Sequence, residues 1–179
     1  RFEAICRFAK PLTVAVLTLP AAPLGTPFDD EAARLGELND VARAEGLVLT
    51  VATSGRTLTA DPAAALALCQ AVPGLGLTLD PSHYINGPHA GANYDDLYPF
   101  VQNVHLRDTG KKPGEFQVRV GQGQVEYGKV VSQLERHGYN RALTVAICRG
   151  GSMSWTEEFT EPRGAPVIVQ ETENAESWR

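Results

Sequence analysis

Five short runs of apolar residues, separated by helical patterns, constrain the fold of this chain more than any other feature. Each run is rich in Val, Leu and Thr, and they span residues 12–18, 47–53, 75–80, 100–106 and 142–147. Nearly continuous apolar runs are typical of parallel strands that are covered on both faces. Because helical patterns alternate with these strands, the sequence predicts βαβ units, a parallel sheet and the α/β fold class.

The segments between the runs carry helix signals. An apolar stripe at helical spacing follows Asp29 and Asp30, either of which can cap a helix, and Gly46 is placed to end it. Asp61 stands directly before a proline, which favours a second helix start at that point. Helices are therefore predicted over residues 1–10, 28–45, 61–71, 93–98 and 125–137.

The number of strands limits the architecture. A closed eight-stranded barrel usually takes about 250 residues, and this chain has 179 residues with five predicted strands. We therefore favour a partial barrel over residues 1–149, followed by a C-terminal tail over 150–179 that is acidic and shows little periodicity. A doubly wound sheet is the alternative, although the first strand-to-helix loops lack its glycine fingerprint.

A partial barrel has two open edges, at the runs 12–18 and 142–147. Unpaired backbone at a sheet edge invites association with another chain. We expect these edges to be covered by N-terminal units of a longer parent chain or by a homo-oligomer.

The amino-acid composition argues against nucleic acids and membranes as binding partners. A formal net charge of -5 offers no basic surface for nucleic acid, and no apolar run approaches the ~20 residues that cross a bilayer. Cys6, Cys69 and Cys148 are odd in number and irregularly spaced, which indicates reduced, mostly buried thiols. We expect a cytoplasmic protein without nucleic-acid or membrane partners.

Two apolar runs end abruptly in groups that can bind a metal or move a proton. Asp80 and His83 follow the third run, with a proline turn between them, and His105 ends the fourth. Active sites of parallel barrels are built at these strand ends. One oxygen and two nitrogen ligands suit Mn, Zn, Co or Fe better than Mg. In the alternative interpretation Asp80 caps the following turn, and both histidines pack against neighbouring loops.

Further polar groups follow the fourth run. Arg107 shares a strand face with His105 and can grip a phosphate, a carboxylate or a sugar hydroxyl. Asp108 can orient a histidine as an outer-shell partner, although an Arg–Asp pair on the rim is an equal alternative. Gly121-Gln122-Gly123 predicts a tight turn into the next helix, with Gln122 at the mouth of the pocket.

These motifs, together with residues 138–145, resemble the xylose isomerase-like barrels. That superfamily contains sugar phosphate isomerases and epimerases, and its relatives include hydroxypyruvate isomerases, inosose dehydratases and apurinic endonucleases. The resemblance runs from about residue 12 to 147. It implies a (β/α)8 TIM barrel of which this chain covers the last five units, and a sugar or sugar phosphate as substrate.

The resemblance also implies roles for the site residues. Asp80 and His105 fall on ligands of a divalent metal (Mn, Co, Zn or Mg), and His83 falls on a histidine that contacts substrate or metal depending on the relative. From their positions, we expect His83, Arg107 and Gln122 to bind the substrate. The superfamily places two further metal-binding glutamates at the ends of the second and fifth strands.

Alanines stand where those two glutamates are expected. Ala52 and Ala146 stand one residue before the ends of the two runs, so both groups that bind metal and transfer protons are missing, each worth typically ~10²–10⁴-fold in rate. Two functions stay open: a metal-dependent isomerase or epimerase, or an inactive barrel that binds a carbohydrate-like ligand or a partner protein. The metal is expected to be weakly held or absent. Nucleic-acid cleavage is disfavoured by the acidic composition.

Overall fold

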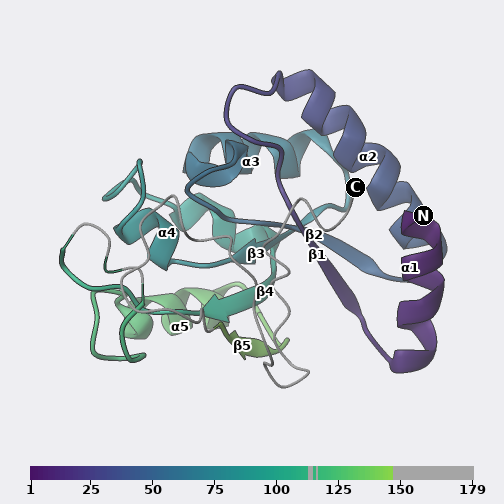
Figure 1. Ribbon diagram of the computed structural model, residues 1–179. Helices are drawn as coiled ribbons and strands as arrows, with labels where there is room; N and C mark the ends of the chain where they lie inside the picture. The colour runs from purple at the N-terminus through teal and green to yellow at the C-terminus, as the bar shows by residue number, and fades with distance from the viewer. Residues whose placement is uncertain (113–114, 116, 147–179) are drawn as a thin grey trace.

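Five parallel strands form one sheet, in which the strand order follows the chain. The computed structural model describes residues 1–112, 115 and 117–146. Within them every neighbouring pair of strands is parallel, and the order is β1-β2-β3-β4-β5 (Figure 1). The strands are β1 (Val16–Pro20), β2 (Val48–Ala52), β3 (Gly76–Leu79), β4 (Val101–Leu106) and β5 (Leu143–Val145). This arrangement is a half-barrel, as the strand count predicted.

Helices connect consecutive strands and lie around the sheet (Figure 1). The α-helices are α1 (Phe2–Ala9), α2 (Phe28–Ala44), α3 (Pro62–Ala71), α4 (Ser82–Ile85) and α5 (Tyr127–Arg136). Short 3-10 turns add η1 (Lys10–Leu12), η2 (Leu58–Ala60) and η3 (Asp95–Phe100). None of the helices that the structure describes is long and apolar enough to cross a bilayer.

The two faces of the sheet differ sharply in polarity. On the face toward the helices, the strands present fully buried apolar side chains, including Leu49, Val51, Leu77, Leu79 and Val104. On the opposite, inner face, the hydroxyls of Thr18, Thr50 and Thr78 hydrogen-bond one another at 2.7 to 2.9 Å across β1, β2 and β3. The apolar runs therefore alternate, and threonine fills the inner positions with hydroxyls that satisfy each other.

Most element boundaries agree with the sequence to within a few residues, and the differences have local causes. β1 begins at Val16 rather than at residue 12, because η1 and a left-handed Thr13 (φ 57°) occupy the start of the predicted run. α2 begins at Phe28, so Asp29 and Asp30 lie in its first turn and do not cap it. The Asp61 cap is confirmed by its side-chain bond to the Ala63 N–H at 2.9 Å.

The edges of the half-barrel are β1 and β5 among the described residues. Leu143 and Val145 on β5 are 45% and 44% exposed, which marks that edge as apolar and uncovered by the described part of the chain. Cys6 and Cys69 are free and buried, as predicted. Cys148 and the predicted 150–179 tail lie outside the described residues.

Candidate functional site

Strand register brings four inner-face positions to one rim of the half-barrel. Thr50 and Thr78 lie on the inner face, and successive residues of a strand alternate between faces, so Ala52 and Asp80 share that face one step closer to the carboxyl end. On β4 and β5, Thr144 pairs with His105 in register, and its hydroxyl bonds to Asn103. Ala146 and Arg107 come next along the same face.

Asp80 is a fully buried carboxylate whose two oxygens both accept hydrogen bonds. Oδ1 accepts from the Ser82 backbone N–H at 3.0 Å and from the Ser82 hydroxyl at 2.6 Å. Oδ2 accepts from Arg107 Nε at 2.9 Å. The backbone of Asp80 is held by Thr53, whose hydroxyl accepts its N–H at 2.8 Å. The role of Ser82 as a donor to Asp80 was not predicted from the sequence, although an Asp followed two residues later by a Ser is a recognisable turn signal.

Among the residues that the structure describes, Arg107 is the largest fully buried side chain, and it connects two of the predicted site residues. It is 2% exposed, and besides Asp80 it reaches the Ser82 hydroxyl at 3.2 Å and His83 Nε2. A guanidinium can only donate, so His83 Nε2 is the acceptor in this contact, and the Gly55 N–H approaches His83 Nδ1 at 3.4 Å. Removing one partner of a buried ion pair costs about 3–5 kcal/mol. The structure thus brings Asp80, His83 and Arg107 together in one buried cluster.

His105 lies on the same inner face and belongs to a neighbouring polar chain. Its Nε2 is 3.3 Å from Asn103 Nδ2, and Asn103 Oδ1 accepts from the Thr144 hydroxyl at 3.3 Å. His105 is 3% exposed. Among the residues that the structure describes, no three His, Cys, Asp or Glu side chains are placed to hold a metal together.

Asp108 fastens the loop between β4 and α5 to the end of the strand. Its Oδ1 accepts the N–H groups of Thr109 and Val125 at 2.9 and 3.0 Å, and its Oδ2 accepts those of Gly121 and Gly123, both at 2.9 Å. The sequence left a histidine or an arginine as the alternative partners of Asp108, and these four bonds all come from backbone amides. The turn at Gly121 provides two of them, with Gly121 at φ 84°.

The loop that Asp108 holds contains the predicted Gln122. Gln122 is exposed, and its backbone N–H donates to the Arg119 carbonyl at 2.9 Å. Directly after the loop, the Tyr127 hydroxyl donates to the Arg107 carbonyl at 2.8 Å, which fixes α5 against the site. Burial raises the pKa of Tyr127, so its hydroxyl stays a donor at ordinary pH. No sequence pattern indicated this role of Tyr127, because it depends on how α5 packs.

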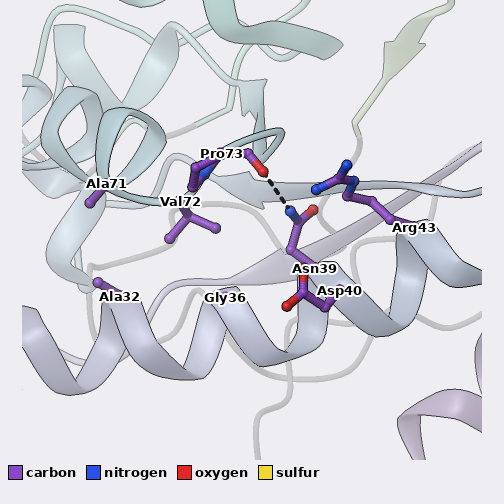
Figure 2. A pocket seen from close by; sticks show the side chains of 8 residues that line it. All are labelled: Ala32, Gly36, Asn39, Asp40, Arg43, Ala71, Val72 and Pro73. Carbon is purple, nitrogen blue, oxygen red and sulfur yellow. Dashed lines mark hydrogen bonds between the residues drawn. The ribbon is translucent and has the colours of Figure 1, made fainter.

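A hollow of about 210 Å³ lies elsewhere, between α2 and the end of α3. Gly36, Asn39 and Arg43 line it from α2, and Asn39 Nδ2 donates to the Pro73 carbonyl at 3.1 Å (Figure 2). Pro73 comes just before β3 begins, so the hollow lies beside the amino ends of the strands. Catalytic sites of parallel barrels lie at the carboxyl ends, and the hollow is therefore separate from the Asp80 cluster.

Comparison with known proteins identifies the family. The model of the xylose isomerase-like TIM barrel family matches residues 1–166. The chain belongs to this family. None of the curated proteins matches the chain.

Solved structures of the same family share the fold. A xylose isomerase domain protein from Planctomyces limnophilus is 20% identical, with a TM-score of 0.67 over 82% of this chain and 57% of its own. A barrel protein from Mycobacterium smegmatis, in complex with magnesium, is 17% identical, with a TM-score of 0.65 over 77% and 56%. An L-ribulose 3-epimerase is 18% identical, with a TM-score of 0.62 over 86% and 53%. The chain spans about half the length of these family members.

The described residues at the rim do not fit a divalent cation. Ala52 and Ala146 supply no ligand, and Arg107 already lies on Asp80. A divalent cation about 4 Å from a guanidinium is repelled by roughly 8 kcal/mol at an effective dielectric constant of about 20. A metal at Asp80 and His105 would therefore have to compete with the Arg107 guanidinium for the same carboxylate.

Proposed function

We propose that this chain is a sugar or sugar-phosphate isomerase/epimerase-like protein that binds its ligand at the carboxyl ends of β3 and β4. The buried cluster of Asp80, His83 and Arg107 carries the proposal. It lies at the end of two adjacent strands, where barrel enzymes bind substrates, and it combines an anion, a cation and an imidazole. The similarity to the L-ribulose 3-epimerase structure supports a sugar as the ligand class.

The proposed roles follow from chemistry and position. Arg107 and His83 contact the substrate, because a guanidinium fork and an imidazole suit phosphate, carboxylate and hydroxyl oxygens. Gln122 approaches the ligand from the exposed loop that Asp108 holds. In a metal-dependent form of the activity, Asp80 and His105 are the ligands of the divalent metal. We also propose a cytoplasmic protein with a small-molecule ligand.

A second candidate, binding without turnover, is favoured by one specific observation. Ala52 and Ala146 occupy inner-face positions at the ends of β2 and β5, the strands that flank β3 and β4, where the family resemblance places metal-binding glutamates. Alanine can neither bind a metal nor move a proton. In this form the barrel holds a carbohydrate-like ligand, or a partner protein, and releases it unchanged.

Ligand-induced stabilisation tests the shared proposal. The melting temperature of the protein is measured against ketopentoses, ketohexoses and their phosphates, each with and without EDTA. A ligand present at a free concentration of 100 times its Kd stabilises the folded state by about 2.7 kcal/mol. We expect a rise in melting temperature that Arg107→Lys abolishes and that the exposed control Arg136→Lys retains. No shift with any sugar or sugar phosphate would reject the proposal.

Turnover separates the two candidates. Epimerisation or isomerisation of the stabilising sugar, followed by NMR in the presence of Mn²⁺ or Co²⁺, supports the metal-dependent enzyme. Binding that is unchanged by EDTA, without any turnover, supports the inactive barrel.

A further inference from the structure

The rim of the half-barrel has a built-in cation. Arg107 Nε lies 2.9 Å from Asp80 Oδ2, inside a cluster in which Asp80 is 0% and Arg107 2% exposed. This contact is not a loose surface pair, because the Ser82 hydroxyl bonds both Asp80 Oδ1 and Arg107 Nε. The guanidinium therefore occupies the side of the carboxylate that faces His83.

The Nε2 atoms of the two neighbouring histidines also lie against nitrogen atoms of the protein. His83 Nε2 faces the guanidinium, which can only donate to it. His105 Nε2 lies 3.3 Å from the Asn103 amide nitrogen, while the amide oxygen accepts from Thr144. A metal at Asp80 Oδ2 or at His105 Nε2 would thus have to compete with a protein nitrogen that already lies at that atom.

Ala52 and Ala146 lie at the same rim as the cluster and carry no charge. Ala52 lies beside Thr78 in register, one step before Asp80, and the Ala146 N–H donates to the Leu106 carbonyl at 3.2 Å, beside Arg107. Both positions point to the same inner face as the cluster. Carboxylates there would add negative charge around Arg107 and compete with Asp80 for it, whereas alanines add no charge.

We infer that the Arg107 guanidinium takes the place of a divalent cation at this rim, so that the site is held together without a metal. A magnesium complex is known for the Mycobacterium smegmatis barrel, whereas Arg107 lies on the Asp80 carboxylate in this chain. The inference deepens the proposed function by removing the metal from it, and its metal-binding test does not depend on whether a sugar binds.

Direct titration with Mn²⁺, followed by the EPR signal of the free ion, tests the inference on the full chain. We expect no wild-type binding tighter than millimolar. Ala52→Glu combined with Ala146→Glu supplies two carboxylates at the rim, and we expect it to raise Mn²⁺ affinity by about tenfold or more. The matched pair Ala52→Gln and Ala146→Gln, similar in size but uncharged, should gain nothing.

Two results would overturn the inference. Micromolar Mn²⁺ binding by the wild type that Asp80→Asn abolishes would show that Arg107 does not exclude the metal. If the double glutamate variant folds but binds Mn²⁺ no more tightly than the wild type, the alanines are not the cause of the weak metal binding. If circular dichroism shows that the pair does not fold, Ala52→Glu alone, at a partly exposed position, is measured against the same two criteria.

Discussion

The carboxylate of Asp108 fills the space that a side chain at Gly123 would need. A Cβ atom built on Gly123 would lie 2.1 Å from Asp108 Oδ1 and 2.4 Å from the Thr109 carbonyl oxygen. The Gly123 N–H meanwhile donates to Asp108 Oδ2 at 2.9 Å. The close approach that makes this bond possible is available only to glycine.

Gly123→Ala should therefore lower the free energy of unfolding by about 3 kcal/mol, at the upper end of the cost of overpacking. Gly128→Ala is the matched control, since a Cβ there meets nothing within 4 Å and the residue lies in α5. That control should be neutral or stabilising by up to about 1 kcal/mol. Urea unfolding of both variants measures the difference, and equal stability would refute the close contact.

Asp108→Asn should loosen the loop between β4 and α5. The carboxylate accepts four backbone N–H groups, and an amide can accept with only one of its two groups. We expect a loss of about 3 kcal/mol in the free energy of unfolding. Hydrogen exchange at Gly121, Gly123 and Val125 should also become faster. Asp40→Asn, at an exposed position of α2, should leave both quantities unchanged.

The three threonine hydroxyls on the inner face should show non-additive energetics. Thr50→Val leaves Thr18 and Thr78 bonded to each other at 2.9 Å but removes the shared partner of both. We expect a cost of about 1–2 kcal/mol for the single change, because buried hydroxyls lose a partner. Replacing all three by valine should cost clearly less than three times that amount. A strictly additive triple variant in urea unfolding would contradict the mutual bonding.

Cys69 should make stability fall at alkaline pH. Burial raises the pKa of its thiol from 9.0 to about 12, so the unfolded chain releases the proton at lower pH than the folded one. The stabilisation is complete below pH 9 and is lost as pH rises toward 12, by about 1.4 kcal/mol at pH 10. Urea unfolding at pH 8 and pH 10, in reductant, should show a smaller decline for Cys69→Ala than for the wild type. An equal decline would contradict the assignment to Cys69.

The half-barrel could be predicted from the sequence because the type of each secondary-structure element depends on the local pattern of apolar residues. Each predicted strand run overlaps an observed strand, and the half-barrel follows from the strand count. The error at the first strand came from the segment before Val16, where a 3-10 turn and the left-handed Thr13 override an apolar pattern. Such a turn carries no strong local signal.

The contacts of the site residues could not be read from the sequence in the same way. The spacing of Asp80 and His83 placed them on one turn, but the pairing of Asp80 with Arg107 depends on the register between β3 and β4, which includes a shift at Leu77. The role of Asp108 likewise depends on how the glycine turn folds back onto it. The position of a residue in a motif can be read from the local sequence, whereas its hydrogen-bond partner depends on how the strands pair in the sheet.

A crystal structure from crystals soaked in Mn²⁺, with anomalous diffraction recorded at the manganese edge, tests the account of the rim most directly. We expect no anomalous peak between Asp80 and His105, and Arg107 Nε within hydrogen-bond distance of Asp80. A manganese peak bound by Asp80, with the guanidinium of Arg107 displaced from the carboxylate, would contradict the account.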